Sequence, residues 1–316
     1  MTDKHEAAQI RPADPAGIAA AAQLLRAGGL VALPTETVYG LAARADSAEA
    51  VAAIYRAKGR PDFNPLIVHV PSVAAAQRLA VLDHRAARLA AEFWPGALTL
   101  VVPLRADAAV APAVTAGLPT LALRCPAHPV MRAVLAASGL PLAAPSANRS
   151  GGVSPTRAEH VAASLGEAVP LVLDGGACAA GLESTIVALR DDHRWQVLRP
   201  GPITADQIAG VLGCPPEAVT SAAIEAPGQL ASHYAPGKPV RLDAVAAGPD
   251  EFLIGFGPVP GDLSLSPTGD LAEAAAQLYA ALHAAAAAPQ PLIAVAPIPA
   301  DGIGAAINDR LARAAA

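Results

Sequence analysis

Residues 58–70 read KGRPDFNPLIVHV and join the end of a predicted helix to a predicted buried strand. The helix is expected to begin after Ser47, a good N-terminal cap, and to end at Gly59. The apolar run Leu66 to Val70 has the length and composition of a buried strand. On both sides of this segment, apolar runs alternate with alanine-rich helical stretches in the same way. This alternation is typical of an α/β fold.

Two predicted domains are separated by a change in composition. The first has predicted strands at 30–34, 66–70, 98–104, 120–123, 141–145, 171–173, 185–189 and 196–199, and helices at 15–28, 47–59, 72–93 (mostly helical), 127–138 and 156–165, the last capped by Thr156. Between 200 and 239, proline and glycine interrupt the chain around one short helix at 204–212. Strands at 240–245, 251–256 and 292–296, with helices at 269–287 and from 305, then predict a smaller α/β domain.

The composition excludes several classes of protein. The chain has 316 residues, 53% of them apolar, a net charge of −5 and only 16% charged residues, against about 25% in an average globular protein. It should therefore fold, and it has no overall basic charge to attract nucleic acid or membrane lipids. Cys125, Cys178 and Cys214 are too widely spaced for a zinc knuckle or a disulfide framework. With no apolar run of membrane-spanning length and no apolar signal core, we expect a soluble cytoplasmic protein.

Two cations stand in the segment that opens this section. Lys58 is one of three lysines in the chain, and Arg60 follows it across a glycine and precedes a proline. Cations spaced in this way spread from a stiffened loop, which suits the binding of an anion. An equally good interpretation is that they complement the C-terminal dipole of the preceding helix.

The second informative segment reads APSANRSGGVSPT, residues 144–156. Its hydroxyls, amide and glycine N–H groups could line a phosphate or a ribose. An ordinary polar loop is the alternative interpretation. The sequence has neither the GxxxxGK[ST] nor the GxGxxG phosphate-binding motif, which argues against a P-loop NTPase and a dinucleotide enzyme.

Polar residues also stand at the ends of other predicted strands. PTETVYGL, residues 34–41, leaves the first of them at the edge where α/β sheets usually bind ligands. Arg124 ends an apolar strand, where an arginine is costly unless an anion meets it. His69 lies inside a strand, where a structural role is the commoner explanation. Ser146 has no GxSxG motif around it, and we expect Cys125 to be a packing residue rather than a nucleophile.

Taken together, these motifs resemble one known family. PTETVYGL, KGRPDFNPLIVHV, FWPGALTLVV (93–102), LALRCPAHP (121–129), APSANRSGGVSPT, STIV (184–187) and VLRPG (197–201) occur in the order and spacing of threonylcarbamoyl-AMP synthases. SHYAP (232–236), LSPTGDLAEAA (265–275) and GIGAAINDRL (302–311) resemble the long form of that family. The resemblance implies a YrdC-like domain with a twisted mixed sheet and a concave site over 10–210, a linker over 211–238 and a small Rossmann-like α/β domain over 239–316.

The resemblance also implies an activity and a set of site residues. The family combines L-threonine, bicarbonate or CO₂, and ATP with Mg²⁺ into threonylcarbamoyl-AMP and pyrophosphate, and a partner transferase complex passes the threonylcarbamoyl group to adenosine 37 of tRNA. By similarity Lys58 and Arg60 would be catalytic and bind the triphosphate, and Mg²⁺ would be held through the ATP phosphates rather than by a protein metal site. The rest of the implied nucleotide site is Asn64, Thr120, Ser146, Asn148 (a supporting polar group), Ser154, Arg199 and the linker residue Tyr234. The implied threonine site is Thr37, His69, Arg124, Ala144 (backbone or shape only) and Ser184.

Three other functions fit parts of the sequence. Hydrogenase-maturation carbamoyltransferases contain a similar domain but need further modules and cysteine pairs. A module binding double-stranded RNA or tRNA has this fold, but the acidic charge and 3% aromatic content predict weak or no direct RNA binding. Short relatives act in ribosome maturation, from which the second domain and Tyr234 argue away. Two departures from the family are APGQL at 226–230 and Ala42 after YGL.

Overall fold

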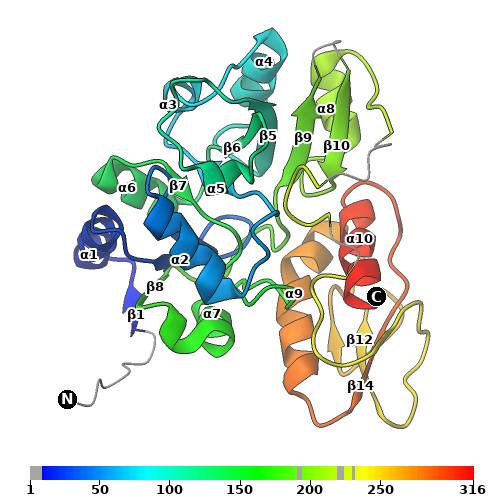
Figure 1. Ribbon diagram of the computed structural model, residues 1–316. Helices are drawn as coiled ribbons and strands as arrows, with labels where there is room; N and C mark the ends of the chain where they lie inside the picture. The colour runs from blue at the N-terminus through cyan, green and yellow to red at the C-terminus, as the bar shows by residue number, and fades with distance from the viewer. Residues whose placement is uncertain (1–8, 191–193, 219–223, 230–231) are drawn as a thin grey trace, which may run out of the picture.

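The computed structural model describes residues 9–190, 194–218, 224–229 and 232–316. In these segments the chain forms two sheets that lie in separate parts of the molecule (Figure 1). The large sheet has ten strands in the order β1 (Gln9–Pro12), β8 (Leu171–Asp174), β2 (Val31–Leu33), β3 (Gly40–Arg44), β7 (Leu142–Ala143), β4 (Ile67–His69), β6 (Thr120–Arg124), β5 (Leu98–Pro103), β9 (Thr185–Leu189) and β10 (Trp195–Arg199).

The large sheet mixes parallel and antiparallel pairs. Strand β4 runs parallel to β6, with His69 opposite Arg124, whereas β5 runs antiparallel to β6. Helices of the same unit are α1 (Pro15–Arg26), α2 (Ala48–Lys58), α3 (Val73–Gln77), α4 (His84–Phe93), α5 (Pro112–Thr115), α6 (Pro129–Ser138), α7 (Ala158–Leu165), the 3-10 turn η1 (Gly166–Ala168) and α8 (Ala205–Leu212). The predicted twisted mixed sheet is confirmed, and its register brings two candidate ligand-binding residues side by side.

The smaller sheet is parallel throughout. Its order is β11 (Val240–Arg241), β14 (Leu292–Val295), β12 (Glu251–Gly255) and β13 (Leu263–Ser264), and it packs with α9 (Leu271–Ala287) and α10 (Gly304–Ala314). Parallel strands joined through helices are the arrangement expected of the predicted small α/β domain. Parts of the predicted linker, residues 219–223 and 230–231, lie outside the described residues.

Most predicted helices begin and end where their capping residues stand. The Ser47 side chain accepts a hydrogen bond from the Ala50 N–H, and Gly59 ends α2 with a left-handed φ of 59°. The predicted helix at 72–93 is interrupted, because Asp83 caps a new helix by accepting the Arg85 and Ala86 N–H groups. The predicted Thr156 cap is wrong: α7 begins after Arg157, and the buried Thr156 hydroxyl has no hydrogen-bond partner.

Several short elements were not predicted. Strand β3 has no alternating pattern because four of its five residues are buried, and β1 has all four residues exposed. Strand β11 is two residues long instead of the predicted six, and Asp243 just beyond it has a left-handed φ of 55°. Such edge strands are too short for a sequence pattern to reveal.

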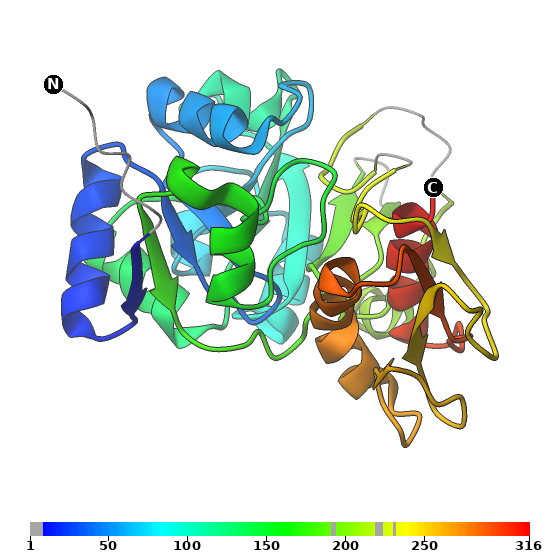
Figure 2. The ribbon, with the colours of Figure 1, turned by 90° about the horizontal axis from the view of Figure 1, so that it is seen from below.

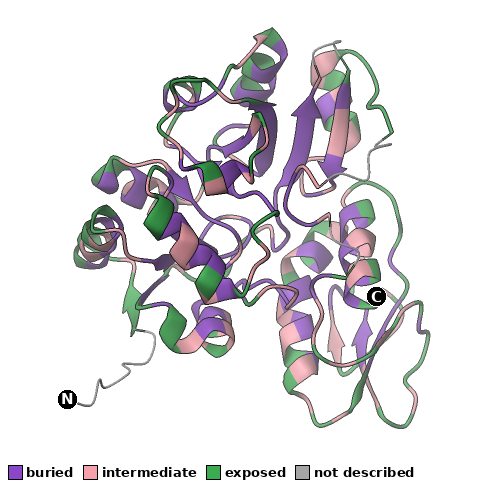
Figure 3. Cartoon of the chain, in the orientation of Figure 1, coloured by how far each residue is buried: buried purple, intermediate pink, exposed green. Residues whose placement is uncertain are grey.

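The buried residues follow the middle of the large sheet. Strands β2, β4, β5, β6 and β9 are buried almost throughout, whereas most exposed positions lie on the outer helices and loops (Figure 3). The loops at one edge of this sheet therefore project from a rigid base. A rigid base of this kind can hold the side chains of a binding site in fixed positions.

The second unit packs closely against the first. Helices α9 and α10 lie beside the β9 end of the large sheet in both views (Figures 1 and 2). Val38, Val153 and Leu182 of the first unit share a buried apolar cluster with these helices and with Tyr234. Gly181 lies so close to α9 that an added Cβ would come within 2.4 Å of the Ala275 carbonyl oxygen. The two units therefore meet at a buried interface directly beside the loop that precedes β9.

Gly181→Ala is expected to destabilise the protein more than Gly213→Ala. Both glycines have a left-handed φ, 67° and 79°, so both variants carry the same backbone strain. Only Gly181 also has α9 against it, because nothing lies within 4 Å of an added Cβ at Gly213. Overpacking of this kind typically costs roughly 1–3 kcal/mol. Chemical denaturation should show that difference between the two variants, and equal unfolding free energies would contradict the close packing of the two units.

Candidate active site

One cavity gathers polar residues from segments far apart in the sequence. It is bordered by the β2–β3 loop, β4, the end of β6, the segment after β7, the start of β9, the end of β10 and the linker before β11. Its lining residues are Thr35, Thr37, Val38, Gly40, Arg60, Ile67, His69, Arg124, Ala144, Pro145, Ser146, Glu183, Ser184, Arg199, Pro227, Gly228, His233 and Tyr234. Three arginines among them make the cavity a place for an anionic ligand.

The predicted site residues fall into two groups in this structure. All five residues of the implied threonine site line the cavity: Thr37, His69, Arg124, Ala144 and Ser184. Of the implied nucleotide site, Arg60, Ser146, Arg199 and Tyr234 also line it. Among the residues that the structure describes, the other five of that set do not: Lys58, Asn64, Thr120, Asn148 and Ser154.

Lys58 supports the cavity wall. It is the last residue of α2, it is buried, and its Nζ donates hydrogen bonds of 2.5 Å to the carbonyl oxygens of Ser146 and Asn148. Burial, together with the nearby Arg60 charge, lowers the Lys58 pKa well below its usual value. The ammonium has three donors, so one is left for an anionic ligand. Lys58 thus joins the two segments that the sequence analysis singled out.

The remaining four nucleotide residues occupy supporting positions. The Asn148 amide donates to the carbonyls of Arg149 and Gly152, and the Ser154 hydroxyl donates to Glu183 over 2.5 Å. Asn64 is buried with its side-chain oxygen unpartnered, and Thr120 starts β6 opposite Pro103. In this structure Asn148 and Ser154 act as struts of the loop that carries Ser146.

Arg60 and Arg199 are held in place by main-chain oxygens. Arg60 donates to the carbonyls of Asn64 and Pro65 over 3.3 and 2.9 Å, within its own loop. Arg199 donates through Nε and Nη2 to the Ser184 carbonyl over 3.2 and 3.0 Å. Burial lowers the Arg60 pKa to about 10, so the guanidinium is charged at neutral pH. Neutral partners leave the positive charges of both groups uncompensated by a carboxylate within these contacts.

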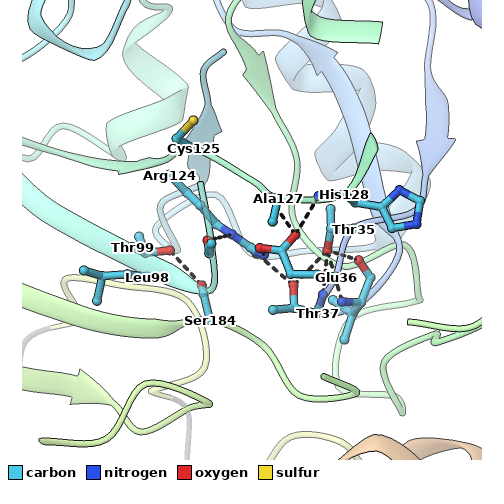
Figure 4. A network of polar contacts seen from close by, with 12 residues as sticks. Thr35, Glu36, Thr37, Leu98, Thr99, Arg124, Cys125, Ala127, His128 and Ser184 are labelled. Carbon is cyan, nitrogen blue, oxygen red and sulfur yellow. Dashed lines mark hydrogen bonds and ion pairs between the residues drawn. The ribbon is translucent and has the colours of Figure 1, made fainter. Parts of the chain in front are cut away.

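Arg124 is fixed on three sides (Figure 4). Its Nε donates to the Gly96 carbonyl over 3.1 Å and its Nη1 to the Thr37 hydroxyl over 2.8 Å, while Nη2 lies 2.6 Å from Glu36 Oε1. A guanidinium has five N–H groups, so these contacts leave donors for a carboxylate in the cavity. Arg124 is thus held at one edge of the cavity with a defined orientation.

Glu36 orients Arg124, a role that sequence reasoning missed. Its Oε2 accepts hydrogen bonds from the N–H groups of Ala127 and His128, just before α6 (Figure 4). Burial opposes ionisation of Glu36, but the Arg124 charge and these hydrogen bonds outweigh burial and lower its pKa. The only sequence signal was a carboxylate at the end of a strand, because its partner lies 88 positions away.

Small polar groups complete this part of the wall. The Thr35 hydroxyl lies 2.8 Å from the Thr37 hydroxyl, and the Ser184 hydroxyl lies 2.7 Å from that of Thr99. His69 is buried beside Arg124, and its Nδ1 has no hydrogen-bond partner. Burial, with the Arg124 charge, lowers the His69 pKa to about 3, so the imidazole is neutral at physiological pH. A neutral imidazole can accept a hydrogen bond from a ligand without adding charge.

The linker closes one side of the cavity. Pro227, Gly228, His233 and Tyr234 all line it, and Tyr234 is buried with a left-handed φ of 65°. The Tyr234 ring stacks on Tyr279 of α9 with a centroid distance of 5.6 Å. Sequence reasoning found Tyr234 but not His233, although the two are adjacent.

The buried histidines predict a loss of stability as the pH falls from 7 to 5.5. Burial lowers the pKa of both His69 and His233 to about 3, whereas an unfolded chain binds these protons near pH 6.5. Their contribution is therefore complete above pH 6.5 and is lost progressively below it, by about 1 kcal/mol each at pH 5.5. Carboxylates with lowered pKa values lose their contribution only below about pH 4.5.

Chemical denaturation at the two pH values measures this effect. The wild-type unfolding free energy should fall by about 2 kcal/mol from these two groups, and His69→Gln should remove about half of that fall. An identical fall in wild type and variant would show that His69 is protonated in the folded protein.

Comparisons with known proteins agree with this geometry. Residues 23–201 match the model of the Sua5/YciO/YrdC family, described as telomere recombination, and residues 203–316 match the C-terminal domain of threonylcarbamoyl-AMP synthase. The threonylcarbamoyl-AMP synthase of Bacillus subtilis is 47% identical over 232 residues, which are 71% of this chain and 66% of that protein. The matched regions span about half to two thirds of the length of the first curated relatives.

Solved structures match nearly the whole chain. The crystal structure of Pyrococcus abyssi Sua5 complexed with L-threonine has a TM-score of 0.85 and 36% identity, covering 94% of each chain. A variant of the same protein, with an adjacent histidine and tyrosine replaced by alanine, has a TM-score of 0.87 and 33% identity, covering 98% of this chain and 96% of that one. Both the two-unit architecture and the linker are therefore within the compared region.

Two further searches concern metals and membranes. Across 9–190, 194–218, 224–229 and 232–316, no three histidine, cysteine or acidic side chains gather closely enough to hold a metal ion. Over the same described segments, no helix combines the length and the apolar character that crossing a bilayer requires.

Proposed function

Because the chain belongs to the threonylcarbamoyl-AMP synthase family, we propose that it is a nucleotidyltransferase that makes threonylcarbamoyl-AMP and pyrophosphate from L-threonine, bicarbonate or CO₂, and ATP. The single observation that carries the proposal is the shared cavity: five residues matched to a threonine site and four matched to a nucleotide site line the same hollow. A relative with 36% identity was crystallised with L-threonine, which supports this assignment.

The proposed reaction joins two anionic partners. The threonine amine adds to CO₂ and loses a proton, which gives a carbamate. A carbamate oxygen then attacks the α-phosphorus of ATP, and the bond from that phosphorus to the β-phosphate bridging oxygen breaks to release pyrophosphate. Carbamate and triphosphate repel each other, so fixed positive charges must hold them together. Arg60, Arg124 and Arg199 are placed to do so.

Each substrate has a natural place in the cavity. The α-carboxylate of threonine fits the free N–H groups of Arg124, beside the Thr37 hydroxyl that already contacts this guanidinium. The neutral His69 can accept a hydrogen bond from the threonine side. The triphosphate fits Arg60 and Arg199, near the Ser146 segment that Lys58 holds. We assign no general base, and positioning and charge carry the catalysis.

Magnesium fits this site as a partner of ATP. The three arginines cannot ligate a cation, and the phosphate oxygens of ATP are the hard oxygen donors that Mg²⁺ prefers. When bound, Mg²⁺ neutralises charge on the phosphate oxygens. The chain's own arginines then orient the triphosphate and stabilise the negative charge that develops on the leaving pyrophosphate.

The product suggests the cellular context. A mixed anhydride of a carbamate and AMP is hydrolysed readily in water, so it should pass to an acceptor soon after release. We propose that a threonylcarbamoyl transferase complex receives it and modifies adenosine 37 of tRNA, and that the protein itself binds RNA weakly or not at all, as its net charge of −5 suggests. ATP supply and three free cysteines suit the cytosol.

Pyrophosphate release with one component omitted at a time tests this proposal. The complete mixture should release pyrophosphate, and omission of threonine, of bicarbonate with CO₂ exclusion, or of ATP should each abolish release. Release that does not depend on threonine would indicate a carbamoyltransferase of the same fold. Absence of release from every mixture, together with tight binding of double-stranded RNA, would indicate an RNA-binding module.

A further inference from the structure

Glu183 is a buried carboxylate at the boundary between the two units. It stands directly before Ser184 and the start of β9, lines the cavity and is 6% exposed. Its Oε1 accepts a 2.5 Å hydrogen bond from the Ser154 hydroxyl of the first unit. A carboxylate in such a place needs further partners, because an unpaired buried charge is costly.

The C-terminal unit supplies those partners. The Tyr279 hydroxyl of α9 donates to Glu183 Oε2 over 2.7 Å, and Arg310 Nε of α10 donates to the same oxygen over 2.9 Å. Both donors are fully buried, with exposed fractions of 0% for Tyr279 and Arg310. Helices from one unit therefore hold a carboxylate that belongs to the active-site wall of the other.

Arg310 connects the same point to two further parts of the wall. Its Nη2 donates to the Pro200 carbonyl over 2.9 Å, next to Arg199, and its guanidinium carbon lies 5.3 Å from the centre of the Tyr234 ring. A guanidinium over an aromatic face is attractive. The cation thus contacts the ends of β10 and of the linker as well as Glu183.

The charges are balanced inside this cluster. Burial opposes ionisation of Glu183, but the charges of Arg310 and Arg199 and the hydrogen bonds from Ser154 and Arg310 outweigh it and lower the Glu183 pKa to about 2. Ionised Glu183 can only accept hydrogen bonds, so Tyr279, Arg310 and Ser154 must all point their hydrogens at it. This fixes the side chain and, through the backbone, the adjacent Ser184.

We propose that the C-terminal domain sets the geometry of the active site through two positioning residues, Tyr279 and Arg310, which hold Glu183 and thereby fix Ser184 in the cavity wall. Neither residue lines the cavity, and both act through Glu183. The second domain is therefore part of the binding apparatus for the amino acid substrate. This inference rests on the proposed function only for the kinetic arm of its test.

Tyr279→Phe tests the proposal with little change of shape, because it removes one hydroxyl and keeps the packed ring. The KM for threonine should rise about tenfold, and the dissociation constant for threonine, measured by calorimetry, should rise to the same extent, while kcat changes less than twofold. Loss of a hydrogen bond to a charged group is large enough for that effect. An unchanged KM and dissociation constant would overturn the proposal.

Ser266→Ala is the matched control. The Ser266 hydroxyl donates to Glu273 Oε2 over 2.6 Å, so this variant also loses one hydroxyl-to-carboxylate hydrogen bond in the C-terminal unit, but away from Glu183. Threonine binding should change less than twofold in this variant. Equal losses in the two variants would reduce the role of Tyr279 to general stability and overturn the proposal.

Hydrogen exchange supplies a readout that does not depend on activity. Backbone amides in the peptide covering 182–188 should exchange several-fold faster in Tyr279→Phe than in wild type and at the wild-type rate in Ser266→Ala. Unchanged exchange in Tyr279→Phe would overturn the positioning role whatever reaction the protein catalyses. Absence of threonine-dependent pyrophosphate release from the wild-type protein would overturn the proposed function and leave the exchange result to decide this inference.

Discussion

Replacing Lys58 or Arg60 by alanine is expected to lower threonine-dependent pyrophosphate release at least a hundredfold. Arg60 lines the cavity with its charge balanced by no carboxylate in its recorded contacts, so it can stabilise the charge that develops on the leaving pyrophosphate. Preorganised donors of this kind are each worth roughly 10²–10³ in kcat. Steady-state rates at saturating threonine measure the effect, with thermal melting to confirm that each variant folds.

The two variants should fail for different reasons. Arg60→Ala removes a ligand-facing charge and only two hydrogen bonds within its own loop, so the melting temperature should change little. Lys58→Ala also removes the bonds to Ser146 and Asn148, so it should be less stable as well as inactive. Arg60→Lys should recover little activity, because an ammonium lacks the planar fork of a guanidinium.

Arg105→Ala provides the control for a lost positive charge. Arg105 is exposed, pairs with Asp107 and lies outside the cavity, so its variant should retain nearly full activity. If Lys58→Ala and Arg60→Ala both turned over at the wild-type rate, neither residue would take part in catalysis.

Arg124→Ala is expected to raise the KM for threonine about a hundredfold and to leave the KM for ATP within about threefold. A charge-assisted, paired contact between a guanidinium and a carboxylate contributes roughly 1.5–3 kcal/mol, which corresponds to about one to two factors of ten. The variant also leaves Glu36 without its cation, so the β2–β3 loop that carries Thr37 loses an anchor. That second loss brings the expected change to the upper end of the range.

Arg85→Ala is a suitable comparison for Arg124→Ala. Arg85 is also buried and paired with an aspartate, Asp83, but it lies outside the cavity and donates to the carbonyls of Arg190 and Arg194. It should lose stability without a change in the threonine KM. If Arg124→Ala changed only the affinity for ATP, the assignment of Arg124 to the amino acid would be wrong.

Local sequence signals predicted the elements and most of the cavity wall. Cap residues such as Ser47 and Gly59 placed helix ends correctly, because a cap acts on backbone groups within a few residues. The polar residues at strand ends converged on one cavity, because neighbouring strands deliver their ends to a common edge. Thr37, His69, Arg124 and Ser184 were found in this way and by resemblance.

Roles that depend on distant partners could not be predicted. Glu36 and Glu183 are both carboxylates beside predicted site residues, but their functions arise from Arg124 and Arg310, which lie 88 and 127 positions further along the chain. The support that Lys58 gives to the Ser146 loop is equally non-local. A sequence pattern shows residue types and spacing, whereas these contacts depend on the order of strands in the sheet and on how the second unit docks.

A crystal structure with L-threonine and a non-hydrolysable ATP analogue tests the central claim most directly. We expect the threonine carboxylate on Arg124 and the triphosphate on Arg60 and Arg199, with the amine of threonine facing the α-phosphorus across one continuous cavity. Nucleotide bound at another surface, with the cavity free of both molecules, would contradict it.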